Sequence, residues 1–143
     1  MKKIFFPLFF VLAGCATIVS PETEVTQTLS AMNQAYRDKD ADLFMSFVSP
    51  EYRGKRDEFQ IAVENDFAGF SQVDCRMSVF QVLIDPETGI YTASVYYSRT
   101  ARSPRFGADS RGGDAVLTFT KDEKSGLRLI EMSSPAPYGL ISP

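Results

Sequence analysis

The sequence predicts an α+β domain in which three N-terminal helices pack on a curved antiparallel sheet. Apolar residues recur at helical spacing up to about residue 70 and then alternate with a period of two. Helical segments followed by a run of strands favour helices on one face of an antiparallel sheet. The chain has 143 residues, of which 44% are hydrophobic, which suits one domain with an ordinary core.

Three helices are expected between residues 21 and 70. Ser20 and Pro21 form a helix start, a hydroxyl cap followed by proline at the first helical position. Asp40 can cap a second, short helix, which ends before Pro50 because the residue preceding a proline leaves the helical region. A third helix is predicted from about residue 56 to Gly69. The first helix carries an apolar stripe of Val25, Leu29, Met32 and Tyr36.

Four strands are expected after residue 70. In residues 73–84 the alternation slips at Phe80, which then shares its phase with Val82 and Ile84, so we expect a β-bulge in one long strand. The remaining segment, residues 133–143, contains three prolines and is predicted to be irregular. The other three strands are expected at residues 91–99, 115–120 and 127–132.

The composition excludes several kinds of chemistry. The chain contains no His, so it has neither a Ser/His/Asp nor a Cys/His catalytic arrangement, and no His-ligated zinc site. Its two cysteines, Cys15 and Cys75, cannot form a disulfide scaffold or an all-cysteine zinc site. We therefore expect no metal and no cofactor. Cys75 lies in an alternating apolar segment and is expected to be a small buried hydrophobe.

The first residues have the pattern of a secretion signal. Lys2 and Lys3 precede an apolar run that is much shorter than the about 20 residues needed to span a membrane. The run ends in Leu-Ala-Gly-Cys at residues 12–15, which resembles the lipobox of bacterial lipoproteins. The resemblance implies that the Cys15 thiol carries acyl chains, palmitate among them, and that the chain is cut before Cys15. A plain signal peptide with a coincidental cysteine is the alternative.

The lipobox divides the chain and suggests its location. Residues 1–14 are the signal peptide, residues 15–24 the lipid anchor and a short tether, and residues 25–143 a single domain. The mature chain has 129 residues (143 − 14) and a formal charge of −5 (13 Lys+Arg against 18 Asp+Glu), which argues against nucleic acid as a partner. Ala16 follows the cysteine, so the resemblance implies a lipid-anchored protein of the cell envelope, at the outer membrane in a Gram-negative host.

Two segments of the helical half have a familiar pattern: residues 35–40, with the sequence AYRDKD, and residues 43–52. They resemble the opening of the nuclear transport factor 2-like superfamily, which includes polyketide-cyclase (SnoaL-like) domains. Residues 57–70, 113–132 and the Tyr138-Gly139 pair also fit. The resemblance implies a bent sheet that closes a cone around an apolar cavity. That superfamily contains enzymes, small-ligand binders and protein-interaction modules, so the resemblance implies no single function and carries over no catalytic residue.

Four side chains are candidates for acid–base chemistry because of their positions. Tyr36 lies on the apolar stripe of the first helix, and Tyr97 lies near the end of the apolar face of the second strand. Glu131 would be a buried carboxylate if the face with Leu127 and Leu129 is the inner one, although Ile130 and Met132 compete for that side. Asp66 could point inward from the third helix, with solvent as the alternative.

A cluster of arginines is a candidate anion-binding site. The connection from residue 99 to residue 113 concentrates positive charge on an acidic chain, and Arg forks suit phosphate or carboxylate. The alternative is a solvated hairpin loop, balanced in part by Asp109 and Asp114. The four arginines are Arg99, Arg102, Arg105 and Arg111.

These observations predict a membrane-anchored lipoprotein whose domain binds a small apolar ligand or a protein partner without catalysis. The alternative is a small cavity enzyme that transfers protons on an apolar substrate, as isomerases and dehydratases do. A third hypothesis is an interaction module that pairs sheet to sheet as a homodimer. An interaction module would have a filled interior and an exposed apolar sheet face, whereas an enzyme needs a buried carboxylate beside a tyrosine.

Overall fold

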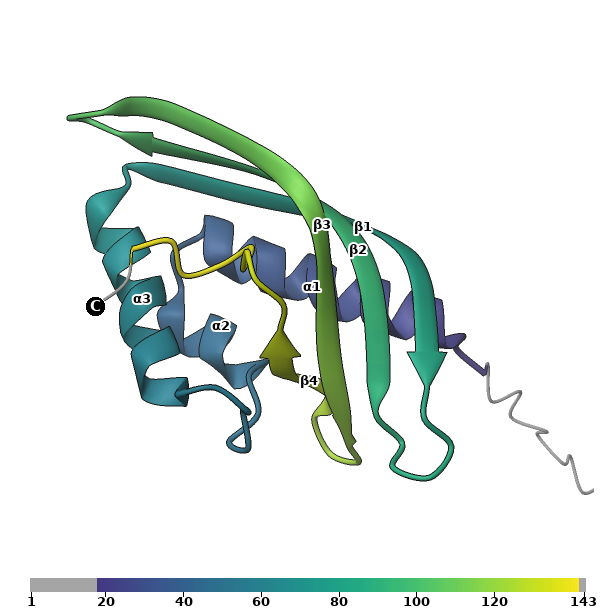
Figure 1. Ribbon diagram of the computed structural model, residues 1–143. Helices are drawn as coiled ribbons and strands as arrows, with labels where there is room; N and C mark the ends of the chain where they lie inside the picture. The colour runs from purple at the N-terminus through teal and green to yellow at the C-terminus, as the bar shows by residue number, and fades with distance from the viewer. Residues whose placement is uncertain (1–17, 142–143) are drawn as a thin grey trace, which may run out of the picture.

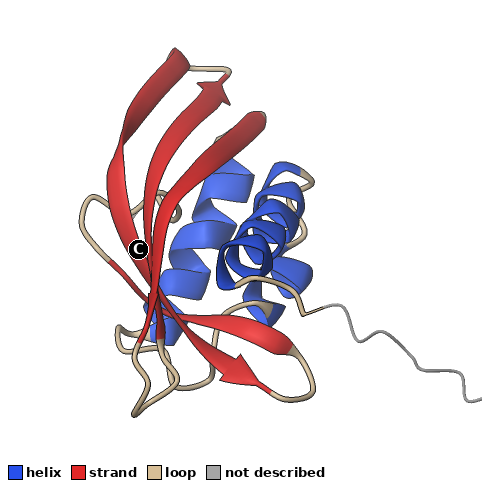
Figure 2. Cartoon of the chain, turned by 90° about the vertical axis from the view of Figure 1, so that its right-hand side faces the viewer, coloured by secondary structure: helices blue, strands red, loops and turns tan. Residues whose placement is uncertain are grey.

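The computed structural model describes residues 18–141, which form three helices followed by a four-stranded sheet (Figure 1). The strands pair antiparallel in the order β1-β2-β3-β4. The helices lie together on one side of the bent sheet (Figure 2). The predicted α+β class, with helices before strands, is therefore confirmed. The elements are α1 (Pro21–Arg37), α2 (Ala41–Ser46), α3 (Arg56–Gly69), β1 (Gln72–Ile84), β2 (Tyr91–Ser103), β3 (Gly107–Asp122) and β4 (Gly126–Met132).

The helix starts follow their capping residues. The Ser20 hydroxyl accepts a hydrogen bond from the Thr23 N–H at 3.2 Å, and α1 begins at Pro21, so residues 21–24 form its first turn. Asp40 caps α2 in the same way, because its carboxylate accepts from the Leu43 N–H at 2.9 Å. The apolar stripe of α1 is buried against the sheet, which is why a helix rich in polar residues is held in place.

Lys39 joins the end of α1 to the end of α3. Its backbone has a φ of 57°, in the left-handed region, where a non-glycine residue is uncommon. Its ammonium group donates to the carbonyl oxygens of Phe67, at 3.1 Å, and of Phe70. A cation at the carbonyl end of a helix is favoured by the helix dipole, so Lys39 stabilises the C-terminal end of α3.

The predicted bulge in β1 is present, but Phe80 lies on the other side of the sheet from the one expected. The register against β2 shifts between Val79 and Gln81. Phe80 is therefore the extra residue of the bulge and is exposed, whereas we expected it to share a face with Val82 and Ile84. With Phe80, three further exposed apolar side chains lie on the outer face of the sheet: Leu83, Tyr96 and Val116.

The connection from residue 99 to residue 113 forms a pair of strands. β2 continues to Ser103 and β3 begins at Gly107, so the residues from 99 to 111 pair across a tight hairpin. Main-chain hydrogen bonds hold this pairing with few apolar side chains, and Gly107 supplies the positive φ of 75° at the turn. The hairpin projects beyond α3 at the end of the molecule opposite the start of α1 (Figure 1).

Candidate functional site

A buried carboxylate on α3 organises the interior. Asp66 is fully buried and is held by donors from two other parts of the chain. The backbone N–H groups of Leu140 and Ile141 each donate to it at 2.8 Å, and the hydroxyl of Tyr36 also donates to it. These three donors replace the water that a carboxylate loses on burial. The last described residues of the chain are thereby tied to α3.

Tyr36 brings the other half of this carboxylate–phenol pair from α1. Its ring is fully buried. The centroid of this ring lies 5.6 Å from the centroid of the Phe44 ring and 5.3 Å from that of the Phe67 ring. Burial raises the pKa of Tyr36 far above its usual value, and the neighbouring Asp66 carboxylate raises it further. The phenol therefore stays protonated and acts as a hydrogen-bond donor to Asp66.

The C-terminal segment, defined here as residues 133–141, fills the space beside this pair. It follows β4 and crosses between the sheet and the helices (Figure 1). Its Tyr138 is 1% exposed and packs edge-on against the rings of Tyr36, at 5.1 Å between centroids, and Phe44, at 4.9 Å. The Tyr138 hydroxyl donates to the side-chain oxygen of Asn33 on α1. Burial raises the pKa of Tyr138 well above its usual value.

Gly139 allows the segment to lie close to α3. Its φ of 70° favours glycine, and a Cβ at this position would lie 3.2 Å from the Cβ of Ala62 and 3.4 Å from the ring of Phe59. The chain can therefore turn directly after Tyr138 and present its next two N–H groups to Asp66.

Arg99 holds the same segment from the sheet side. Its guanidinium is buried and donates to the carbonyl oxygens of Ala136, at 3.2 Å, and Pro137, at 3.4 Å. It also lies 5.9 Å from the centre of the Tyr97 ring, in a cation–π arrangement. Asn33, Asp66 and Arg99 thus bind one segment from three elements: α1, α3 and β2.

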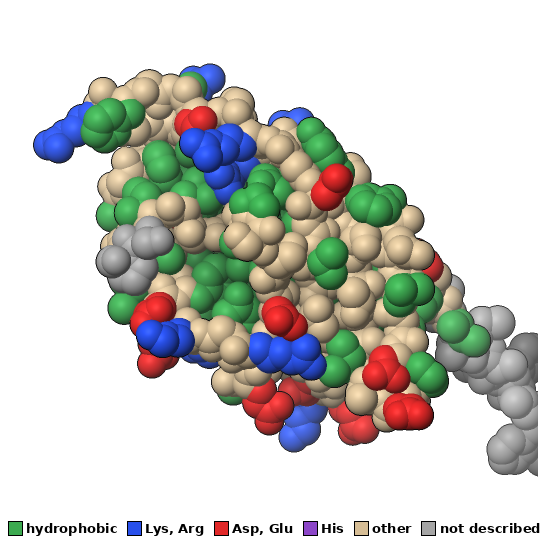
Figure 3. All heavy atoms as spheres, in the orientation of Figure 1, with side chains coloured by type: hydrophobic (Ala, Val, Ile, Leu, Met, Phe, Trp, Pro, Cys, Tyr) green, Lys and Arg blue, Asp and Glu red, His purple; other side chains and the backbone are tan. Residues whose placement is uncertain are grey.

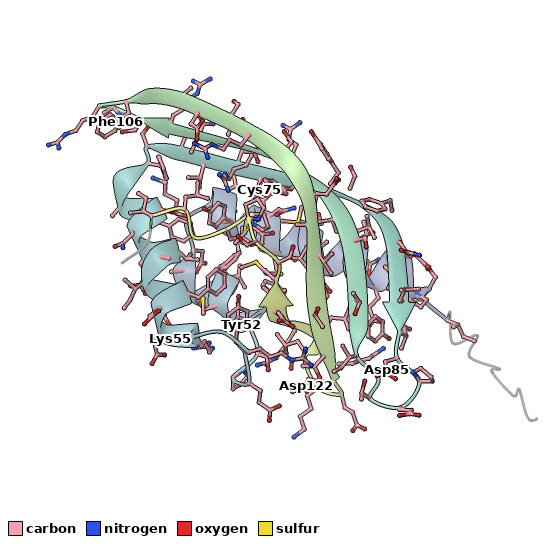
Figure 4. The ribbon with its side chains drawn as sticks, viewed as in Figure 1. Tyr52, Lys55, Cys75, Asp85, Phe106 and Asp122 are labelled. Atoms are coloured by element: carbon pink, nitrogen blue, oxygen red, sulfur yellow. The ribbon has the colours of Figure 1, made fainter. Side chains whose placement is uncertain are left out.

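Cys75 faces this interior opposite Arg99 (Figure 4). It is fully buried, as expected for a small hydrophobe. Burial raises the pKa of the Cys75 thiol to about 12, although the charge of Arg99 acts in the opposite direction. A neutral, enclosed thiol of this kind is inert as a nucleophile at neutral pH.

The structure brings together only part of the predicted acid–base set. Tyr36 and Asp66 are in direct contact, and Tyr97 is buried beside Arg99. Glu131 lies away from them, with its carboxylate half-exposed and paired with Arg53 at 2.9 Å. The register of β4 against β3 shifts beside Ile130. Ile130 therefore points inward, as Leu129 does, and Glu131 points outward.

The four predicted arginines do not form one site. Arg99 is buried and bound to the C-terminal segment, and Arg111 pairs with Asp109 at 3.0 Å. Arg102 and Arg105 lie exposed near the hairpin tip, and no carboxylate within residues 18–141 lies within ion-pair distance of either. Arg99 and Arg111 are cross-strand neighbours, whereas alternation along β2 turns Arg102 to the opposite face from Arg99.

A surface groove lies between the C-terminal end of α3 and the β2–β3 hairpin. Its volume is about 750 Å³, within the range of small-ligand sites. It is lined by Phe67, Phe70, Pro104, Phe106 and Ile141, with Lys39 and Arg105 also contributing. Hydrophobic side chains and Lys or Arg side chains meet at this end of the molecule in Figure 3, and Figure 4 shows Phe106 at the hairpin tip.

Sequence reasoning singled out Asp66 and Arg99, for other roles, and missed the pair that Asn33 and Tyr138 form. Asn33 and Tyr138 act through a contact between positions 105 residues apart. The segment was expected to be irregular, and the structure agrees. No pattern in the local sequence predicts that it is buried. The pair of an aromatic residue and a glycine at residues 138–139 was the one available hint.

The described residues offer neither a metal site nor a membrane-spanning helix. Within residues 18–141, no group of three His, Cys, Asp or Glu side chains is placed to hold a metal ion. In the same part of the chain, no helix is long and apolar enough to cross a membrane. Cys15 and Ala16 lie outside the described residues.

Solved structures of similar shape establish the fold. No protein-family model and no curated protein matches the sequence. A nuclear transport factor 2-like superfamily protein from Salmonella enterica serovar Typhimurium has a TM-score of 0.60 at 20% identity, over 83% of this chain and 94% of that chain. A conserved protein from Planctomyces limnophilus has a TM-score of 0.66 at 13% identity, over 76% and 90%.

A third similar structure is Aln2 from a Streptomyces species, with a TM-score of 0.63 at 16% identity over 80% of this chain and 90% of that chain. Identities this low establish a shared architecture and not a shared activity. The domain therefore has the nuclear transport factor 2-like fold.

Proposed function

We propose that this protein is a lipid-anchored protein of the bacterial cell envelope whose domain binds a ligand or partner at its surface and catalyses no reaction. One observation carries the non-catalytic part. The C-terminal segment occupies the interior, and the polar side chains that could act on a substrate bind its backbone instead. Asp66 accepts hydrogen bonds from two N–H groups of the segment, and Arg99 donates to two of its carbonyl oxygens. The cone expected from the family resemblance would then be closed by the chain itself.

The anchoring part rests on the lipobox and is tested at Cys15. Replacing Cys15 with Ser should abolish incorporation of labelled palmitate and leave an unprocessed precursor, because the acylated atom is the thiol sulfur. Cys75→Ala is the matched control, since a buried cysteine of the domain should not affect acylation. Membrane fractionation of both variants completes the measurement. Normal processing and palmitate labelling of Cys15→Ser would contradict the proposal.

The enzyme alternative has one observation in its favour. Tyr36 and Asp66 form the buried tyrosine–carboxylate pair that proton transfer would need. A substrate could reach them only if the C-terminal segment left its place, because Tyr138 packs directly on Tyr36. The two proposals therefore differ in how often this segment opens.

Hydrogen exchange distinguishes these two proposals. Under the binding proposal, the Leu140 and Ile141 amides exchange nearly as slowly as the Leu129 amide, which donates to the Phe47 carbonyl at 2.8 Å beside the core. Exchange of the first two amides about 100-fold faster than that of Leu129 would indicate a segment that opens separately, and would favour the enzyme. The measurement is residue-resolved exchange by NMR at neutral pH.

A further inference from the structure

The groove under the β2–β3 hairpin is built by three separate parts of the chain. Ser71, directly after α3, donates its backbone N–H to the Arg102 carbonyl at 2.8 Å and its hydroxyl to the same oxygen at 3.1 Å. Lys39 binds the last carbonyls of α3 from the other side. At Gly69 a Cβ would lie 2.7 Å from the Cδ1 atom of Ile141, so glycine lets the C-terminal segment close one end. These contacts give the groove a defined shape.

The lining of the groove is apolar. Phe67 and Phe70 are partly buried, and they leave part of each ring toward the groove. Phe106 is 88% exposed at the hairpin tip, where no other part of the described chain covers it. An exposed aromatic ring beside a concave apolar surface is a site at which an apolar ligand removes area from water. The lining therefore favours a hydrocarbon chain over a sugar or a nucleotide.

The rim of the groove is positively charged. Arg105 and Lys39 lie in the lining, and Arg105 has no ion-pair partner within residues 18–141. Arg102 points to the opposite face of β2 and does not line the groove. This contrasts with the rest of the hairpin, where Arg111 is already paired with Asp109. Since the whole chain carries a formal charge of −3, the local positive charge selects an anionic head group.

We propose that this groove binds a long-chain fatty acid, with the acyl chain against Phe67, Phe70 and Phe106 and the carboxylate at Arg105. This inference rests on the proposed binding function and names its ligand class. An Arg fork donates two hydrogen bonds to a carboxylate, and the apolar groove buries the acyl chain. The ligand is thus a single amphiphile and not the surface of a bilayer.

Photocrosslinking of the full chain tests this site directly. A fatty acid that carries a photoreactive group along its chain should form adducts in peptides that contain residues 67–71 and 103–106. Arg105→Glu and Phe106→Ser should each lower this labelling by about tenfold, because each removes a main contact with one part of the ligand. Both side chains are exposed, so neither change should disturb folding.

Matched variants on another strand control for general effects of charge and exposure. Arg76→Glu and Phe80→Ser change an exposed arginine and an exposed phenylalanine of β1, and labelling should stay within about twofold of the original chain. Adducts confined to other peptides, or an equal loss in these controls, would overturn the proposal. Because peptides are mapped individually, any labelling of the first fifteen residues is counted separately.

Two further arms distinguish the ligand's chemistry and its source. The photoreactive methyl ester of the same fatty acid should label residues 67–71 and 103–106 about tenfold less, and equal labelling would overturn the role given to Arg105. Anionic phospholipid vesicles provide the other arm. If the vesicles shield Phe106 from solvent and the free fatty acid forms no adduct, the surface binds a bilayer and the proposal is overturned. Loss of lipidation at Cys15 would not alter any of these results, so this inference and the anchoring proposal fail separately.

Discussion

Asp66 shows how one buried carboxylate can be satisfied without a cation. Its partners are a phenol and two backbone N–H groups, all of which keep their hydrogen at neutral pH. Such charge-assisted hydrogen bonds are stronger than neutral ones and offset the cost of burying the charge. The residue thus serves as an attachment point for the chain end, whereas a carboxylate available for catalysis would face a cavity.

Cys75 leads to a prediction for the pH dependence of stability. Its pKa in the folded protein is about 12, against 9.0 for an unperturbed thiol, so the unfolded state loses its proton first as the pH rises. The contribution of Cys75 to the free energy of unfolding is therefore fully present below pH 9 and is lost progressively as the pH rises toward 12. The unfolding free energy should fall by about 1 kcal/mol between pH 9 and pH 10 from this residue alone.

Denaturant titrations at a series of pH values measure this dependence, with Cys75→Ala as the comparison. The variant should lack the decrease that begins near pH 9. It should keep the decrease at higher pH caused by Tyr36 and Tyr138, whose raised pKa values act in the same direction from an ordinary value of 10.0. Parallel curves for the two proteins between pH 8 and pH 10 would show that Cys75 is not buried as described.

At the scale of elements, the C-terminal segment contributes to the core as a helix or strand would. It has no regular structure, yet Tyr138 is among the largest fully buried side chains of the domain. The segment makes side-chain and backbone hydrogen bonds to Asn33, Asp66 and Arg99, so its polar groups are satisfied without a ladder. Its removal would uncover both the aromatic cluster and three polar side chains.

Truncation of Tyr138 should therefore be costly. Tyr138→Ala removes a buried ring and leaves Asn33 without its partner, so we expect a loss of about 3 kcal/mol or more in the free energy of unfolding. Tyr96→Ala is the matched control, since this ring lies half-exposed on the outer face of the sheet, and should cost less than about 1 kcal/mol. Equal losses in the two variants, measured by denaturant unfolding, would mean that the segment does not pack in the interior.

At the scale of the whole molecule, the two ends of the domain differ in role. α1 begins at one end, and the β2–β3 hairpin with its groove lies at the other (Figure 1). The start of α1 and the proposed fatty-acid site are therefore separated by the length of the domain.

Much of the fold could be predicted because its signals are local. The caps at Ser20 and Asp40 and the end of α3 at Gly69 follow from short-range hydrogen bonding and backbone preference. The bulge in β1 could also be predicted, since a slip in alternation is visible in the sequence. The direction of Phe80 could not, because either neighbour of a slip can be the extra residue.

Local patterns in the sequence were enough to predict the order of helices and strands, the chemistry excluded by the missing histidine, and the place of Tyr36 in the core. Tertiary structure alone decided that Asp66 faces Tyr36, that Glu131 faces solvent, and that the chain end fills the interior. The physical reason is the range of the interactions. Capping and periodicity act over a few residues, whereas the contact of Asp66 with Leu140 joins positions 74 residues apart, and only the packed chain brings them together.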